Sequence, residues 1–365
     1  MKMRASVCAA AVTCVVLLCA PGAHAGPITP PPGPVTSTPG PEPRIAINAT
    51  NTPGDANSIF RIAQPGSYYL TGNVTGEAAK NGIEIGASGV TLDLNGFDVV
   101  GVTGSLDGIS ATASLRNFTL RNGSVRNWGD DGVDLSTSLS RMARVEAVHA
   151  SGNATDGIRA GDGGLVVNCH ASYNGEDGIS SALTVTGSVA RNNGGFGFSI
   201  TAGGVIVDSA AYDNTDYGIY ASNGCTIMRC SSRSNGDGII AFGDSLIKEC
   251  TSTVNTGDGI NGQQGTTIID CIASDNGDDG IIVLSRSLVR GNTCNGNGSD
   301  GIFVSSSGAN RIEGNHMSGN GRGLYVIGAG NVILKNTASG NTTVNWSIVA
   351  NNIVAPIIDR TAVVS

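Results

Sequence analysis

The chain has 365 residues and a formal net charge of −8 at pH 7, with 14% charged and 4% aromatic residues but 54 glycines. A net negative chain without a basic patch argues against a nucleic-acid partner. Few charges and many glycines are typical of a fold built from tight turns and uncharged stacked strands.

The N-terminus has the features of a secretion signal in residues 1–25. A short basic start precedes an apolar stretch, residues 5–20, that is too short for a membrane span, and Ala23-His24-Ala25 is a small-x-small cleavage site. The rest of the sequence holds no apolar run long enough to cross a bilayer. We therefore expect an exported protein, extracellular or periplasmic, whose mature chain begins at Gly26.

The domain organisation follows from composition and from a repeat. Residues 26–44 are rich in proline and predict an extended linker. The repeat predicts one solenoid over residues 79–341, and a solenoid needs covered ends. We expect residues 45–78 to cap its N-terminal end and residues 342–365 to cap its C-terminal end, in a protein that is a monomer.

A tripeptide related to Asp-Gly-Ile recurs along the chain, mostly at intervals near 21 residues. Its glycine, called the repeat glycine below, stands at Gly82, Gly108, Gly132, Gly157, Gly178, Gly197, Gly218, Gly238, Gly259, Gly280, Gly301 and Gly323. Between these glycines, short alternating stretches are separated by Gly and Asn, which is a strand–turn–strand pattern. The period predicts a stack of about a dozen β-coils. Leucine-rich repeats have a similar period, but their Leu-rich consensus is absent from this sequence.

Equivalent residues of successive coils form columns. We expect three columns to lie inside: the residue after the repeat glycine, a small residue that is often cysteine, and the apolar residue three positions before it. A fourth column is asparagine, which tolerates the backbone of a bend and can hydrogen-bond its own copies. It comprises Asn153, Asn174, Asn193, Asn214, Asn235, Asn255, Asn276, Asn297 and Asn320.

Cysteine fills the small column in three consecutive coils, at Cys230, Cys250 and Cys271. Their spacing permits a disulfide between neighbours, and export permits oxidation. Serine and asparagine occupy the same column elsewhere, so we favour buried free thiols.

The chain resembles the right-handed parallel β-helix proteins of the pectin-lyase-like superfamily over about residues 64–341. Besides the asparagine column, residues 64–70 (QPGSYYL) and 89–96 (GVTLDLNG) look like the first coils of such proteins. The resemblance implies an all-β fold, a right-handed parallel β-helix. It is unspecific for function, because the superfamily includes pectate lyases, polygalacturonases, epimerases and adhesins.

Aspartate precedes the repeat glycine in most coils, and stacked carboxylates repel one another. Bound calcium would relieve the repulsion, since calcium takes carboxylate oxygens. Alternatively, each aspartate accepts hydrogen bonds from N–H groups of the adjacent turn, which is the interpretation we favour. Because extra acids mark genuine calcium sites, the doublet Asp278 and Asp279 is the candidate calcium site.

The coils between Gly82 and Gly157 are longer than the others, and long loops on a rigid solenoid often carry sites. His149 and His170 are 21 residues apart, so we expect stacked imidazoles that can bind a metal or share a proton. Asp130 and Asp131 lie in the same region. These four residues are the candidate catalytic residues.

The second residue after the repeat glycine should point outward, since side chains alternate along a strand. In the second half of the chain this column includes Tyr220, Phe303 and Tyr325. Exposed rings stack on sugars or bury against a partner, although β-propensity alone also favours such residues. With Trp128 from the long coils, these rings are the candidate substrate-binding residues.

Two functions remain open from the sequence. One is recognition and cleavage of an extracellular polysaccharide, with β-elimination of a uronate-rich chain as the best reaction, helped by calcium as cofactor. The other is a non-catalytic surface, adhesion or structural protein. No catalytic signature is intact: the polygalacturonase-like Asn214-Thr215-Asp216 lacks its Gly-His-Gly partner, and the Asp-Pro-His-Glu motif of alginate epimerases is absent.

Overall fold

The computed structural model describes residues 44–112, 114–136, 141–305 and 308–355. The predicted signal peptide and all of the predicted linker except Arg44 lie outside these ranges. The described residues form strands, bends and turns, and none of them belongs to a helix that could cross a membrane.

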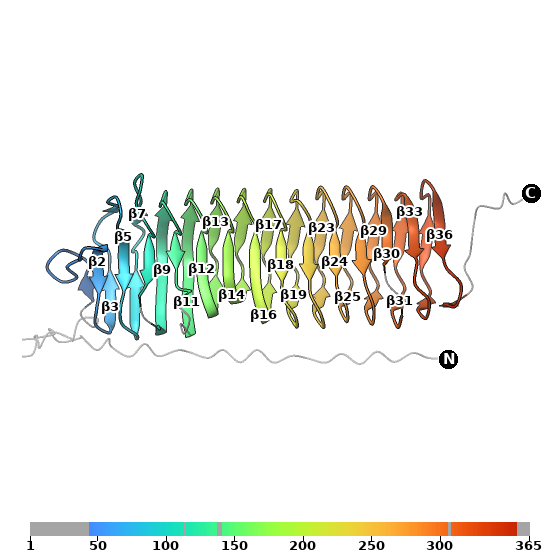
Figure 1. The fold of residues 1–365 in the computed structure, drawn as a ribbon, viewed down its shortest axis with the longest axis horizontal. Coiled ribbons are helices and arrows are strands. Elements are labelled where there is room, and N and C mark those ends of the chain that lie inside the picture. Colours follow the sequence, from blue (N-terminus) through green and yellow to red (C-terminus); the bar gives the residue numbers. More distant parts are fainter. Residues whose placement is uncertain (1–43, 113, 137–140, 306–307, 356–365) are drawn as a thin grey trace, which may run out of the picture. The chain divides into compact units, whose positions relative to one another are not determined.

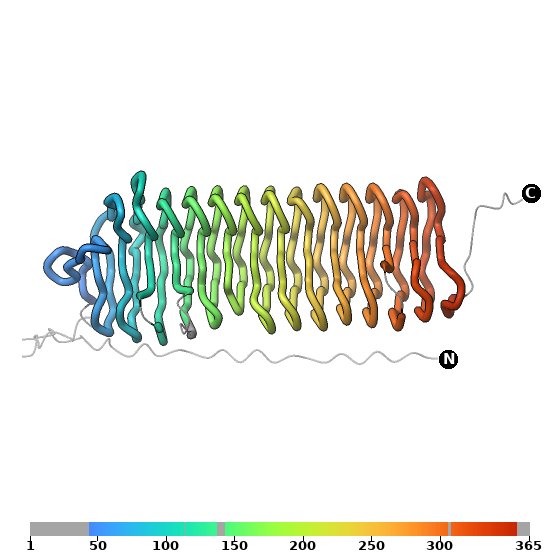
Figure 2. The backbone as a smooth tube through the Cα atoms, in the orientation of Figure 1, coloured from blue at the N-terminus to red at the C-terminus, as the bar shows by residue number. Residues whose placement is uncertain are grey.

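The described chain winds as a parallel β-solenoid in which each coil pairs with the next (Figures 1 and 2). The strand pairs form three rows along the solenoid, which we call sheets 1, 2 and 3. Sheet 1 follows the repeat glycine and has 14 strands, so the solenoid has more coils than the dozen expected. The two additional coils, which contain β2 and β36, lack the tripeptide, and the predicted all-β fold of stacked coils is confirmed.

Sheet 1 consists of β2 (Ser58–Ile62), β5 (Asn81–Ile85), β8 (Ile109–Ala111), β10 (Val133–Asp134), the first part of β12 (Ile158–Val167), β14 (Ile179–Thr186) and β16 (Phe198–Val207), then β18 (Ile219–Ala221), β21 (Ile239–Ala241), β24 (Ile260–Gly262), β27 (Ile281–Val283), β30 (Asp300–Val304), β33 (Arg322–Val326) and β36 (Val344–Ile348).

Sheet 2 consists of β1 (Ile45–Ala46), β3 (Gly66–Tyr69), β6 (Val90–Asp93), the first part of β9 (Arg116–Arg126) and β11 (Arg141–Ser151), the second part of β12, β14 and β16, then β19 (Thr226–Met228), β22 (Leu246–Lys248), β25 (Thr267–Ile269), β28 (Leu288–Arg290), β31 (Arg311–Glu313), β34 (Val332–Leu334) and β37 (Ile353–Val354).

Sheet 3 consists of β4 (Val74–Thr75), β7 (Asp98–Val100), the second part of β9 and β11, then β13 (His170–Ser172), β15 (Val189–Arg191), β17 (Ala210–Tyr212), β20 (Ser231–Arg233), β23 (Thr251–Thr253), β26 (Ile272–Ser274), β29 (Thr293–Asn295), β32 (His316–Ser318) and β35 (Thr337–Ser339).

The core is built from the predicted inward columns. Ile158, Ile219 and Ile281, which follow repeat glycines, are fully buried, as are Val166 and Ile227 in the apolar column. The small column is buried as well, and its cysteines are free thiols, as expected.

The repeat glycine is required by a close approach between coils. A Cβ added at Gly157 would lie 2.6 Å from the carbonyl oxygen of Gly178 and 2.6 Å from the amide nitrogen of Asn174. Both atoms belong to the next coil. A side chain here would therefore push the coils apart, which explains why the glycine recurs.

The asparagine column forms the predicted ladder at the bend between sheets 3 and 1. Asn214 donates from Nδ2 to Oδ1 of Asn235 over 2.9 Å, and its own Oδ1 accepts from Nδ2 of Asn193 over 2.9 Å. The same bond recurs from Asn153 to the Asn341 side chain. The ladder satisfies buried amides without charge.

Parallel pairing extends into the segments predicted as caps. Ile45 in β1 pairs with Tyr68 in β3, and Trp346 in β36 pairs with Leu324 in β33. These segments add strands to the solenoid although they lack the tripeptide. Their capping role stays a prediction.

Candidate functional site

The aspartates before the repeat glycines form a second ladder, at the edge of sheet 1. Oδ1 of Asp131 accepts the backbone N–H of Asp156 over 2.9 Å, and Oδ1 of Asp156 accepts that of Asp177 over 2.9 Å. Asp258 and Asp279 repeat this contact over 3.2 Å. The favoured structural interpretation is therefore right in kind, but the N–H belongs to the next coil rather than to the adjacent turn.

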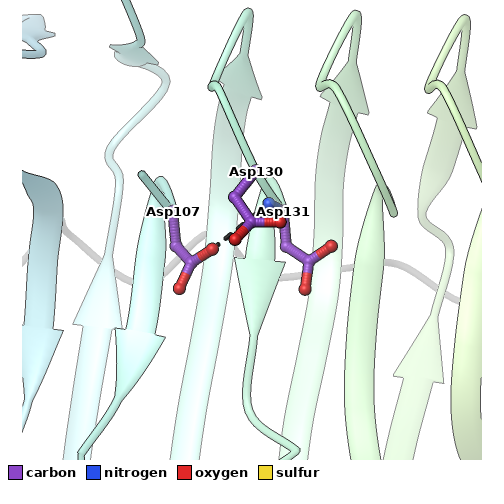
Figure 3. A group of neighbouring side chains, drawn as sticks. All are labelled: Asp107, Asp130 and Asp131. Carbon is purple, nitrogen blue, oxygen red and sulfur yellow. Dashed lines mark hydrogen bonds between the residues drawn. The ribbon is translucent and has the colours of Figure 1, made fainter. Parts of the chain in front are cut away.

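Asp130 and Asp131 join Asp107 in a compact acidic group (Figure 3). One carboxylate oxygen from each lies within 4.8 Å of the others, and the N–H of Asp131 donates to Asp107 over 3.2 Å. Burial, then the charges of Asp131, Asp134 and Asp130, raise the pKa of Asp107 to about 7. The anionic form is destabilised here by burial and by like charge.

Arg159 neutralises part of this acidic edge. Its guanidinium lies 3.1 Å from Oδ2 of Asp131 and 3.4 Å from Oδ2 of Asp156. The two carboxylates belong to successive coils, so one arginine bridges the ladder.

The predicted calcium ligands Asp278 and Asp279 form a similar group with Asp258, within the same 4.8 Å limit. Burial, then the charges of Asp279, Asp237 and Asp278, raise the pKa of Asp258 to about 7. Three carboxylates could supply part of the six to eight oxygens that calcium takes. Two of them already accept ladder N–H groups, which leaves the structural role sufficient by itself.

Four aromatic rings form one cluster on the outer face of sheet 1, and two of them, Phe196 and Tyr217, interrupt the aspartate ladder. We call Phe196, Tyr217, Tyr220 and Phe242 the aromatic cluster. The rings of Phe196 and Tyr220 are stacked with centroids 5.0 Å apart and planes 5° apart. The ring centroid of Tyr217 lies 5.5 Å from that of Phe196, and the ring centroid of Phe242 lies 5.4 Å from that of Tyr220. In both pairs the ring planes are tilted against each other. All four are half-buried, so each ring retains accessible surface.

A second ring pair lies farther along the same face. Phe303 and Tyr325 are stacked with centroids 5.2 Å apart. The guanidinium of Arg322 lies 3.6 Å from the centre of the Tyr325 ring and is paired with Asp300 at 2.5 Å. The sequence thus placed Tyr220, Phe303 and Tyr325 correctly on one outward face.

The electrostatic environment of the aromatic cluster is acidic. Burial, then the charges of Asp237 and Asp216, raise the pKa of Tyr217. Burial also raises the pKa of Asp177 to about 7, with the charge of Asp156 adding to it. The charged neighbours that shift these pKa values are acids, so the face presents carboxyl groups beside rings.

Trp128 is not part of an outward face. Its side chain is 1% exposed, and its indole Nε1 donates to the carbonyl oxygen of Val99 over 3.0 Å. The ring fills the interior of a long coil, where it lies against Gly82 and Gly108. A buried ring cannot stack on a polymer, so the expectation for this residue is wrong. Long coils do not align with the regular ones, which hid its inward position.

His149 and His170 stack as expected, with ring centroids 4.8 Å apart and planes 9° apart. They lie on the outer face of sheet 3, in β11 and β13. Burial, then the charges of His149 and Arg191, lower the pKa of His170. Within the described ranges, no hydrogen bond or ion pair joins either histidine to Asp130 or Asp131, so the four candidates form two separate groups.

The sequence profile described as "Right handed beta helix region" matches residues 81–232 and 221–355, which is more than half of the chain. The chain belongs to this right-handed β-helix family. The search of curated proteins found no match.

Solved structures share the β-helix fold. The A-module of mannuronan C-5 epimerase AlgE6 from Azotobacter vinelandii aligns with a TM-score of 0.56 at 17% identity, covering 80% of this chain and 92% of that one. The A-module of mannuronan C-5 epimerase AlgE4 from the same organism aligns with a TM-score of 0.49 at 14% identity, covering 80% of this chain and 91% of that one. Tailspike protein 3 of bacteriophage CBA120 aligns with a TM-score of 0.38 at 13% identity, covering 83% of this chain and 56% of that one. At these identities the likeness shows the fold.

Within this β-helix, sequence reasoning missed the association of Phe196, Tyr217 and Phe242 with Tyr220. The signal was present for two of them, since Phe196 and Tyr217 replace aspartate in consecutive coils. Phe242 follows the regular strand β21, and only the structure brings it to Tyr220.

Proposed function

We propose that this β-helix protein recognises an extracellular polysaccharide along the outer face of sheet 1. The observation that carries the proposal is the aromatic cluster, which combines stacked rings with neighbouring carboxyl groups. Aromatic faces stack on the apolar faces of sugar rings. Carboxylates accept hydrogen bonds from hydroxyl groups, so both parts of a sugar have a partner here.

The predicted signal peptide supports an encounter with such polymers outside the cytoplasm, in the periplasm or beyond the cell. The likeness to an alginate-modifying epimerase supports the choice of mannuronan-type polymers as first probes. Phe303 and Tyr325 lie on the same face as the aromatic cluster, which favours a ligand that extends along several coils.

The outer face of sheet 1 favours recognition of a polysaccharide without cleavage. β-Elimination needs a cation near the carboxylate and a base for the adjacent proton. In the part of the chain that the structure describes, Arg159 and Arg322, the arginines beside the aspartate ladder, are both ion-paired. If cleavage occurs, the Asp258 group is the place for a cation; calcium there stays a prediction.

The test is retention of the purified mature protein on neutral and anionic polysaccharides in affinity electrophoresis, with calcium or a chelator. The double variant F196A/Y220A removes the stacked pair, and we expect it to lose retention at least about 10-fold, as loss of two stacked rings implies. Ile272→Ala, which truncates an exposed side chain on sheet 3, is the matched control. Unchanged retention of the double variant would refute the proposed face.

The same incubations report on catalysis. Absorbance of unsaturated products would establish a lyase, and new reducing ends without unsaturation would establish a hydrolase. Retention without either product would support the binding role alone.

A further inference from the structure

We propose a second, separate binding site on sheet 3 that takes the carboxylate or sulfate groups of an anionic polysaccharide. Its residues are Tyr173, Arg191, Tyr212, Asp213 and Arg233, called the sheet 3 arginine site below. It lies on a different face from the aromatic cluster and does not depend on the function proposed for sheet 1.

The two arginines are aligned by the strand register. Arg191 in β15 pairs with Tyr212 in β17, and Tyr212 pairs with Arg233 in β20. Equivalent positions on adjacent parallel strands point to the same side, so the three side chains form one outward column. Two inter-strand spacings place the arginine backbones about 10 Å apart along the solenoid.

Both guanidinium groups lack an acidic partner. Within the described residues, neither Arg191 nor Arg233 forms an ion pair, whereas Arg126 in the same column is paired with Asp98 at 3.0 Å. Arg191 instead lies over the ring of Tyr173, 6.0 Å from its centre. Both arginines are exposed, so their donors are free for a ligand. An arginine fork binds carboxylate or sulfate oxygens in pairs.

Two tyrosines form walls beside these charges. Tyr173 is 61% exposed and adopts a left-handed backbone with φ of 57°, which is costly for a bulky residue. It lines an open hollow of about 410 Å³ with Asn192 and Asp213. Tyr212 lines a second hollow of about 470 Å³ with Asp213 and Arg233. Because Asp213 borders both, the hollows adjoin in successive coils.

The charge balance favours an anion. Asp213 is the acid that borders the hollows, and among the described residues it forms no ion pair with either arginine. His170 lies one coil before Arg191 in the neighbouring column, and burial, then the charges of His149 and Arg191, lower its pKa, which disfavours its cationic form. The site therefore carries two positive charges against one negative charge.

A polymer fits this arrangement better than a small anion. Two guanidinium groups separated by two coils need a ligand that carries anionic groups in series. The exposed ring of Tyr173 and the half-buried ring of Tyr212 beside them suit sugar faces. A nucleic acid is disfavoured because the chain has a net charge of −8 and the site offers only two cations.

The experiment measures binding of polygalacturonate, dextran sulfate, neutral dextran and single-stranded DNA to the mature protein, at pH 7 with a chelator. We expect polygalacturonate or dextran sulfate to bind, and added salt to weaken that binding. The polymer that binds decides between carboxylate and sulfate. R191Q/R233Q should weaken binding at least 10-fold. Arg290→Gln, which removes an exposed arginine of sheet 2, should leave binding unchanged.

The proposal is overturned if no anionic polymer binds, if R191Q/R233Q binds as the parent does, or if Arg290→Gln weakens binding equally. Preferential binding of DNA would also overturn it. In the F196A/Y220A background, R191Q/R233Q should weaken the remaining binding of the anionic polymer by the same factor as in the parent, because the two pairs of changes lie on different sheets. Failure at sheet 1 is thereby distinguishable from failure at the sheet 3 arginine site. Tyr173→Ala, with the arginines intact, should also reduce affinity.

Discussion

Phe196 stacks on Tyr220 of the next coil, with ring centroids 5.0 Å apart. Phe196 occupies the position that holds aspartate in the coils before it. The ladder reaches the backbone of this residue, since the N–H of Phe196 donates to Oδ1 of Asp177 over 2.8 Å. The backbone of the coil is therefore kept, and only the side chain facing the solvent has changed.

Restoring the ladder residue should separate binding from folding. In Phe196→Asp, the backbone can keep its bond to Asp177, so we expect a melting temperature near that of the parent. Loss of the stacked ring and addition of a carboxylate should weaken polysaccharide binding about 10-fold or more. Phe196→Tyr is the control and should bind as the parent does. Equal affinities for the Asp and Tyr variants would contradict a role for this ring.

Trp128 should act on stability and not on binding. Trp128→Phe removes the bond from the indole to Val99 and leaves a space in a buried coil, which should cost about 2–4 kcal/mol of unfolding free energy. Chemical denaturation measures the loss, and affinity electrophoresis should show unchanged retention. If Trp128→Phe were as stable as the parent but no longer retained on the polysaccharide, Trp128 would have a role in substrate binding after all.

The asparagine ladder should be locally costly to break. In Asn214→Ala, the amide groups of Asn193 and Asn235 lose partners inside the solenoid, as does the carbonyl of Ala190. Each unsatisfied buried group costs about 1–3 kcal/mol, so we expect a loss of at least about 3 kcal/mol in denaturant unfolding. Thr215→Ala, on the exposed next residue, is the control. A loss of unfolding free energy below about 1 kcal/mol would show that the asparagine ladder follows from the stacking of the coils and does not stabilise it.

The period of the solenoid and its inward columns were predictable because every coil must present the same small set of residues to the same neighbours. Ile158 and Asn174 are repeated for that reason, and repetition is visible in sequence. Trp128 and Phe242 were not predictable, since they lie where coils depart from the repeat and no aligned copy shows their direction. Arg191 and Arg233 differ again: their column was regular, but their lack of acidic partners is a property of the whole surface.

Asp177 should make stability depend on pH. Its pKa is raised from 3.8 to about 7 in the folded state, so the folded protein binds the proton more tightly than the unfolded chain. Its contribution is favourable at low pH and is lost as pH rises from about 4 to about 7. The shift corresponds to at most about 4 kcal/mol, and solvent screening of this half-buried group reduces it to about 2 kcal/mol.

Asp177→Asn keeps an oxygen for the N–H of Phe196 but cannot ionise. We therefore expect the variant to lose less stability than the parent between pH 4 and pH 7, and the two curves to run parallel above pH 8. Unfolding free energies from denaturant titrations at each pH measure this difference. Parallel curves over the whole range would mean that Asp177 titrates normally.

Calcium is the remaining test of the aspartate doublet. The carboxylates of Asp258, Asp278 and Asp279 lie within 4.8 Å of one another, and a divalent cation would relieve their mutual repulsion. We expect calcium to raise the melting temperature of the parent at pH 8 and to have a smaller effect on Asp278→Asn. Asp244→Asn, an exposed aspartate elsewhere, should respond like the parent. If all three proteins respond alike, the group has a structural role alone, because the carboxylates of Asp258 and Asp279 already accept backbone N–H groups from the next coil.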